Sequence, residues 1–213
     1  MEFIKFSKIP RLNRDIVITE KIDGTNAQVY NMVLSNPTAN HRNDFAVKGW
    51  QIFDTEFCSF AVVPASRNKF ITIKKDNYGF AKWVHKHAAE LLQLGPGRHY
   101  GEWWGQGIQR NYGIIGKRFS LFNISQWTEE DPEGGYNLTC PECCHVVPMI
   151  YTGPMSIEIV DRMVRFLAED GSIAAPGFKK PEGVVVFHTA ANQYFKVTCE
   201  NDGVPKGMVQ NGM

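Results

Sequence analysis

The chain has 213 residues, of which 43% are apolar and 21% charged, so it is long enough to bury a core and has the composition of a globular protein. A formal net charge of +1 argues against a surface coated for non-specific nucleic-acid binding, although a local basic cleft stays possible. The N-terminus lacks a signal-peptide pattern, and no apolar run reaches the roughly 20 residues of a membrane span. The five cysteines are a poor disulfide framework. We expect a cytoplasmic protein (host cytoplasm, if it is viral) with no membrane partner.

The first third of the chain is predicted to form strands. The stretch "VITEKIDGTNAQVYNMV", residues 17–33, reads as two apolar strands around a corner, because Asp23-Gly24 is a turn dipeptide of the hairpin type. Residues 35–44, "SNPTANHRND", are polar with proline and asparagine, and so are predicted to be a loop. Two further strands are predicted in "DFAVKGW", 44–50, and "FCSFAVVPAS", 57–66.

Two helices are predicted. One spans residues 77–95, where apolar residues recur at helical spacing until Gly95-Pro96. The other spans 156–171, with Ser156 as N-cap and Gly171 as C-cap. Strand-like runs lie between and after them: 98–104, 118–125, 146–153, 182–188 and 194–199. This order predicts an α+β fold with mostly antiparallel sheets, followed by a frayed polar tail from 201 to 213.

Lys21 stands at the end of an apolar run, between Glu20 and Asp23. A lysine attacks as a neutral amine, so a catalytic lysine needs nearby cations or partial desolvation. The alternative is a strand-end lysine that pairs with one of the two carboxylates, which contributes about 0–1 kcal/mol.

Five downstream residues are further candidates, each with an ordinary alternative. Glu102, in "YGEWWGQGIQRNYG", can accept hydrogen bonds from sugar hydroxyls, or it belongs to a glycine-rich turn. Phe122 can stack on a nucleobase, or it packs in the core. Glu182, before a β-branched run, is a turn residue or a metal-associated carboxylate. Lys196 snorkels outward or points into a cleft. Arg67 follows a strand in "SRNKF".

The segment "CPECCH" contains Cys140, Cys143, Cys144 and His145. A structural zinc site usually takes four ligands from two separated segments. A second cysteine pair is absent, because Cys58 and Cys199 are isolated in the sequence. Packed, reduced thiols are therefore favoured over zinc.

Together, these motifs occur in an order that resembles the covalent nucleotidyltransferase superfamily of polynucleotide ligases and mRNA capping enzymes. Within it, "EKIDGTN" and "GEWWGQGIQRNYG" are most similar to ATP-dependent RNA ligases of the phage and RNA-editing type. The resemblance spans roughly residues 18–200. It implies an α+β nucleotidyltransferase (ATP-grasp-like) domain, residues 1–200, made of antiparallel sheets flanked by helices.

The resemblance also implies a reaction with ATP and Mg²⁺. A lysine attacks the α-phosphate and forms lysyl-AMP, AMP moves to a 5′-phosphate end, and a 3′-hydroxyl then displaces it. The ends are expected to be RNA, with DNA as the alternative. By motif, Lys21 is the nucleophile, Asp23 and Gly24 orient the turn, and Glu182 is metal-associated, directly or through water. The implied nucleotide-binding set is Glu20, Ile22, Arg67, Glu102, Phe122, Glu182 and Lys196. Candidate contacts to nucleic-acid phosphates are Arg110, Lys74 and Lys75, and also Lys5, Lys8, Arg11 and Arg14.

The sequence departs from the family in two ways. Thr198 stands where the family has the second lysine of Lys-x-Lys, so one cationic contact is expected to be missing. The chain also leaves no room for an OB-fold or a helical C-terminal domain, so substrate grip is expected from this domain or a partner. Three alternatives stay open: a non-catalytic nucleotide- or nucleic-acid-binding relative, a minimal DNA ligase, and a zinc-stabilised binding module.

Overall fold

The computed structural model describes residues 3–129 and 137–200, and the chain divides into two compact units. Unit 1 comprises Met1–Ile22 and Pro148–Met213, and unit 2 comprises Asp23–Val147. Each unit combines helices with sheets that are largely antiparallel, so the predicted α+β class is confirmed. The predicted tail, 201–213, lies outside the described residues. None of the helices described is both long and apolar enough to span a bilayer.

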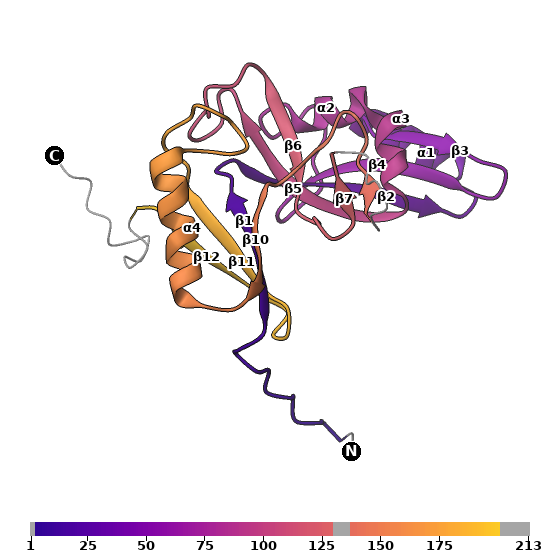
Figure 1. The fold of residues 1–213 in the computed structure, drawn as a ribbon. Coiled ribbons are helices and arrows are strands. Elements are labelled where there is room, and N and C mark those ends of the chain that lie inside the picture. The colour runs from indigo at the N-terminus through magenta and orange to yellow at the C-terminus, as the bar shows by residue number, and fades with distance from the viewer. Residues whose placement is uncertain (1–2, 130–136, 201–213) are drawn as a thin grey trace. The chain divides into compact units, whose positions relative to one another are not determined.

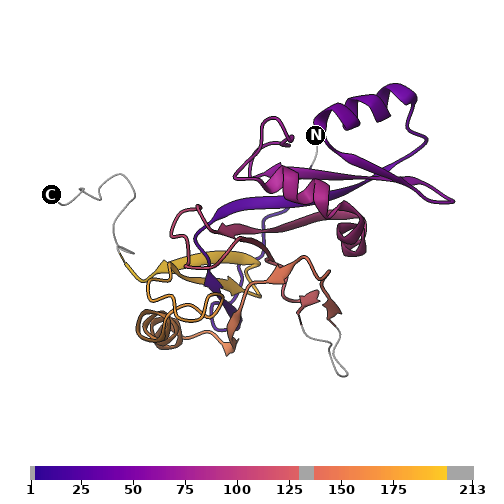
Figure 2. The same ribbon diagram turned by 90° about the horizontal axis from the view of Figure 1, so that it is seen from above.

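Unit 1 is built on a four-stranded antiparallel sheet in the order β10-β1-β11-β12, with one helix, α4, against it (Figure 1). Figure 2 shows this helix end-on, packed against one face of the strands. Apolar residues of the strands, such as Ile18 and Val184, pack against Val160 and Leu167 of the helix. The elements are β1 (Asp15–Lys21), β10 (Met149–Pro154), α4 (Ile157–Asp170), β11 (Gly183–His188) and β12 (Gln193–Thr198).

Helix α4 confirms the helix predicted over 156–171, with one difference at its start. Val160 and Leu167 are buried and Met163 and Val164 partly buried, as the apolar spacing indicates. Ser156 occupies the N-cap position, but its hydroxyl donates to the Glu158 carboxylate and caps no backbone N–H.

Unit 2 is built on a six-stranded sheet in the order β3-β4-β2-β5-β6-β9 and has a separate two-stranded ladder, β7-β8. Its strands are β2 (Thr25–Leu34), β3 (Gln51–Asp54), β4 (Ser59–Ser66), β5 (Gly97–Gly105), β6 (Lys117–Leu121), β7 (Trp127–Thr128), β8 (Leu138–Thr139) and β9 (His145–Val146). Its helices are α1 (Ala39–Lys48), α2 (Phe80–Lys86), α3 (Ala88–Leu91) and the 3₁₀ turn η1 (Leu92–Leu94).

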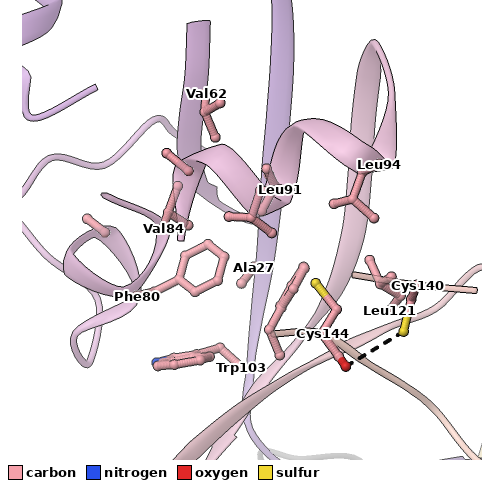
Figure 3. Close-up of a cluster of buried hydrophobic side chains, with 14 of the residues drawn as sticks. Ala27, Val62, Phe80, Val84, Leu91, Leu94, Trp103, Leu121, Cys140 and Cys144 are labelled. Atoms are coloured by element: carbon pink, nitrogen blue, oxygen red, sulfur yellow. Dashed lines mark hydrogen bonds between the residues drawn. The ribbon is translucent and has the colours of Figure 1, made fainter. Parts of the chain in front are cut away.

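The core of unit 2 lies between its sheet and the α2–α3 segment (Figure 3). Phe80, Val84 and Leu91 are fully buried, which confirms the apolar stripe predicted for residues 77–95. The predicted single helix is wrong in one respect. It breaks at His87, whose φ of −105° and ψ of 16° leave the helical region, and continues as α3.

Two local predictions in the first third are wrong. Residues 39–48 form helix α1 in place of a loop and a strand. Thr38 caps the helix by accepting from the His41 N–H, and Gly49, at φ 77°, ends it. None of its residues is buried, so the sequence lacked the apolar stripe of a core helix. Asp23-Gly24 closes no hairpin, because β1 pairs with β10 and β11 while β2 pairs with β4 and β5.

A buried amide joins the sheet of unit 2 to its helices. Asn31, on β2, is 1% exposed, and its Nδ2 donates to the carbonyls of Leu91 (2.8 Å) and Gly95 (2.9 Å). These carbonyls stand at the C-terminal end of the α3–η1 segment, where backbone acceptors lack intrahelical donors. Asn31 therefore both caps this segment and fixes it to the strand.

We predict that Asn31→Ala lowers the free energy of unfolding by about 1–3 kcal/mol, because it removes the side-chain donor to the buried Leu91 carbonyl and one of two groups that contact the Gly95 carbonyl, the other being Nε2 of His99 at 3.1 Å. Urea denaturation followed by tryptophan fluorescence measures the effect. The control is Asn123→Ala, an exposed position where a change below about 0.5 kcal/mol is expected. Equal effects of the two variants would contradict the capping role.

Candidate functional site

The strand register of unit 1 places Lys21 on the sheet face opposite α4. Lys21 pairs with Gly183, and Gly183 pairs with Thr198, so the three lie in one row across β1, β11 and β12. Directly opposed residues present their side chains to the same face, and alternate residues share it. Lys196 therefore lies on this face too, one alternation along β12. Lys21 and both positions of the Lys-x-Lys-like motif thus share one surface.

Lys21 forms an ion pair with Glu182. Its Nζ lies 2.6 Å from Oε2 of the carboxylate, and the two side chains are 23% and 17% exposed. This oxygen is buried and accepts no hydrogen bond within the part of the chain that the structure describes, so the contact is a close charge pair outside hydrogen-bonding alignment. The sequence left Lys21 a choice between Glu20 and Asp23 as its partner, and its partner is Glu182.

Gly183 is required by the close approach of β12. A Cβ at this position would lie 2.1 Å from the Val197 carbonyl oxygen and 2.7 Å from the Thr198 Cα, and the backbone φ is 149°. Any side chain would force the two strands apart. The Glu-Gly dipeptide therefore sets Glu182 at the start of β11, beside the end of β1.

The two positions on β12 differ in their surroundings. Lys196 is exposed, so its ammonium is open to a ligand. Thr198 is half-buried, and its hydroxyl donates to the Glu200 carbonyl over 2.8 Å. A threonine here brings no positive charge to the row of Lys21.

Glu20 is directed to the opposite face and is engaged inside unit 1. The side chain is 1% exposed and accepts from the Ser172 hydroxyl (2.6 Å) and from the N–H groups of Ile173 (2.8 Å) and Ala174 (2.9 Å). Ile22 is also buried, at 5% exposure. Neither side chain is exposed to solvent, and the contact of these two residues with a nucleotide stays a prediction. Sequence reasoning missed Ser172, which is separated from Glu20 by 152 positions.

In unit 2, the turn after Lys21 is fixed by three contacts. The Asp23 N–H donates to the Tyr112 hydroxyl (2.8 Å), and Nε of Arg110 lies 3.0 Å from the Asp23 carboxylate. The Gly24 N–H donates to Oε1 of Glu102 (3.1 Å). A Cβ on Gly24 would lie 2.5 Å from the Trp103 carbonyl, so only glycine fits. Arg110 thus binds this turn through Nε, and its contact with nucleic acid stays a prediction.

Glu102 shares one face of the unit 2 sheet with Phe122. Glu102 pairs with Ser120, and the Phe122 N–H donates to the Tyr100 carbonyl over 2.9 Å, which continues the same register. Alternation therefore puts Tyr100, Glu102, Ser120 and Phe122 on the face opposite the buried Phe119. Phe122 and Tyr100 are 39% and 48% exposed. Tyr100 is a candidate contact that sequence reasoning missed, although alternation from Glu102 would have found it.

The remaining predicted basic residues are exposed. Arg67 follows Ser66 of β4, which pairs with Ala27 of β2. Asn26, directly before Ala27, pairs with Glu102 of β5. Arg67 is thus at the same end of the sheet as Glu102. Lys74 and Lys75 lie on a turn before α2 and are not brought into the rows described above.

The cysteines and the histidine of residues 140–145 do not all contact one another. Cys143 lies beside His87 and Glu90, while His145 pairs with Glu129 over 3.3 Å. Cys140 is buried, and its thiol donates to the Cys144 carbonyl (Figure 3). Burial raises the pKa of the Cys140 thiol to about 11. Cys140 and Cys144 are buried in the core of unit 2, and Cys143 is partly buried against it.

Comparison with solved structures identifies the fold. An RNA ligase of Naegleria gruberi, as a variant with ATP and Mn, is 18% identical with a TM-score of 0.53, and the match covers 89% of this chain and 51% of that one. Another variant of that ligase, with AMP and Mn, is 17% identical with a TM-score of 0.51, and the match covers 88% of this chain and 50% of that one. An apo variant is 18% identical with a TM-score of 0.50, and the match covers 87% of this chain and 49% of that one. The chain thus spans about half the length of these structures.

Among curated proteins, no sequence matches this chain. A family-wide sequence model described as RNA ligase matches residues 14–198, which is most of the chain and nearly the span of the resemblance inferred from the motifs. This protein therefore belongs to the RNA ligase family.

Proposed function

We propose that this chain is the nucleotidyltransferase domain of an ATP-dependent RNA ligase, which joins 5′-phosphate and 3′-hydroxyl ends through lysyl-AMP on Lys21. The observation that carries the proposal is the row formed by Lys21, Gly183 and Thr198 with Glu182 beside it, in a chain of the RNA ligase family. The proposed nucleophile, Lys21, has a carboxylate within 2.6 Å and shares its sheet face with the exposed Lys196.

In the first step, the Lys21 amine forms a bond to the α-phosphorus of ATP, and the bond to pyrophosphate breaks. The amine must first lose a proton and leave its contact with the Glu182 carboxylate. Lys196, exposed on the same face, stabilises the negative charge of the phosphates. In the second step AMP passes to the 5′-phosphate end, and in the third the 3′-hydroxyl displaces AMP.

Glu182 is the residue proposed to hold a divalent cation, Mg²⁺, directly or through water. Its buried Oε2 is charged and accepts no hydrogen bond from the described residues, which suits a cation ligand. When bound, the cation would offset charge on the transferring phosphate. The Naegleria RNA ligase structures with ATP or AMP and Mn support a nucleotide and a divalent cation as ligands.

From the motifs of the family, three residues of unit 2 are also proposed to contact a nucleotide. Glu102, whose Oε1 also accepts from the Gly24 N–H, is proposed to accept from ribose hydroxyls. Phe122, which is exposed, stacks on the base. Arg67, exposed at the same end of the sheet, contacts phosphate. Glu20, Asp23 and Gly24 are positioning residues that hold the backbone on either side of Lys21.

The first prediction concerns the covalent intermediate. With ATP labelled at the α-phosphate and Mg²⁺, label should remain on the wild-type chain in a denaturing gel and be lost in Lys21→Ala, because only Lys21 supplies the amine. The matched control is Lys82→Ala, at an exposed position on α2, which should label like wild type. The adduct should then transfer label to a 5′-phosphorylated RNA.

Well-folded protein that takes up no label would contradict the ligase proposal and favour a non-catalytic nucleotide-binding relative. Transfer of label to DNA ends at a rate equal to or above that for RNA ends would contradict the RNA preference and favour a minimal DNA ligase.

A prediction for Glu20 distinguishes a positioning role from direct contact with the nucleotide. Glu20→Ala should lower the free energy of unfolding by about 3 kcal/mol, since three donors lose a buried charged acceptor. The apparent affinity for ATP should change less than the rate of adduct formation, and Glu20→Gln should recover part of that rate. Glu169→Ala, at an exposed position, is the control. A selective loss of ATP affinity at unchanged stability would show that Glu20 contacts the nucleotide.

Another prediction tests whether the positive charge that the family has at position 198 matters for the reaction. Thr198→Lys should speed adduct formation or sealing on the order of tenfold, because it adds a cation to the row of Lys21. Gln193→Lys adds the same charge at the other end of β12 and should leave both rates unchanged. Single-turnover rates of the labelled steps measure the effect. Equal rates in wild type and Thr198→Lys would mean that another group supplies the contact.

A further inference from the structure

We propose that His87, Glu90, Cys143 and Cys144 form a structural zinc site in unit 2. The proposal is independent of the ligase chemistry, since none of these residues lies on the sheet faces assigned to the nucleotide. The site ties the helical segment α2–α3 to the residues that lead from β8 to β9.

Three of the four groups already lie together. Ligand atoms of His87, Glu90 and Cys143 all fall within 4.8 Å of one another. Nδ1 of His87 is 2.9 Å from Oε1 of Glu90. Imidazole, carboxylate and thiolate are all zinc ligands, and a thiolate in the set disfavours Mg²⁺ and Ca²⁺. The donor set therefore selects a soft or borderline metal.

Cys144 is the proposed fourth ligand, and because its Sγ is outside the group of three, binding requires it to move toward His87 and Glu90. Its Sγ lies 3.9 Å from that of Cys143. Two thiolates bound to one zinc at about 2.3 Å in tetrahedral geometry stand about 3.8 Å apart. The separation in the structure therefore agrees with the edge of a zinc tetrahedron, whereas a disulfide would need about 2 Å.

The backbone holds these ligands in two separate segments. His87 stands at the break between α2 and α3, and Glu90 follows three residues later on α3. Cys143 and Cys144 lie on a turn that the Cys144 N–H closes on the Pro141 carbonyl over 2.7 Å. Sequence reasoning looked for a second cysteine pair, and the structure offers His-x-x-Glu on a helix in its place. The His87 ring is also fixed against Trp83, with ring centroids 5.3 Å apart.

The other cysteine of "CPECCH" and its histidine have different partners. The Cys140 thiol donates to the Cys144 carbonyl, and His145 binds Glu129. The ligand set therefore differs from the one that the sequence order suggests. On binding, each coordinating thiol gives up its proton, so occupancy releases up to two protons and falls as pH is lowered.

The test is the metal content of the purified full chain, expressed with zinc in the medium and measured by mass spectrometry of the elements. About one zinc per chain is expected, and His87→Ala, Cys143→Ser and Cys144→Ser should each lower it about tenfold. The controls are Cys58→Ser and His41→Ala, which remove the same residue types outside the site and should keep the zinc. Wild-type protein without zinc, or retention in all three ligand variants, would overturn the proposal.

A variant could also lose zinc because it misfolds, so a second test uses the wild-type chain. Chelation should lower the thermal midpoint, and added zinc, but not Mg²⁺, should restore it. Cobalt(II) added to the metal-free chain should give the visible d–d bands of a tetrahedral thiolate site. A midpoint that does not respond to chelation, or an octahedral cobalt spectrum, would overturn the proposal.

Discussion

The register of β1 against β11 is the constraint on which the candidate site depends. It places Lys21 opposite Gly183, so the carboxylate of the preceding residue, Glu182, meets the lysine ammonium at 2.6 Å. A shift by one residue would turn Lys21 toward α4 and expose the apolar residues that pack there. The burial of Ile16, Ile18, Val184 and Val186 therefore fixes the same alignment that presents the lysine.

The residues on the two sides of Lys21 are bound by different parts of the chain. Glu20 is bound by a hydroxyl and two backbone N–H groups within unit 1. Asp23 and Gly24 are bound within unit 2 by Tyr112, Arg110 and Glu102. Lys21 differs from these residues because its contact with Glu182 is a charge pair without an aligned hydrogen bond.

Sequence reasoning found the α+β class, the apolar stripes of both main helices, the strands that carry Lys21 and Glu102, and the strand that follows Glu182. These features follow from periodicity and from local motifs. It missed α1, because a helix that is held by its caps buries no residue and shows no stripe. It missed the Lys21–Glu182 pair, the Glu20–Ser172 contact and the His87–Cys143 cluster, because each joins residues far apart in the sequence.

Strand β12 has a neighbour on only one side among the described residues, so it is a sheet edge on which Tyr194 and Phe195 are exposed. Such an edge is a template for pairing with another chain, and a lysine within it opposes that association. Lys196 thus opposes edge-to-edge association of this strand, in addition to the nucleotide contact proposed for it. An apolar replacement would lower the yield of soluble protein, and activity in such a variant is meaningful only per folded molecule.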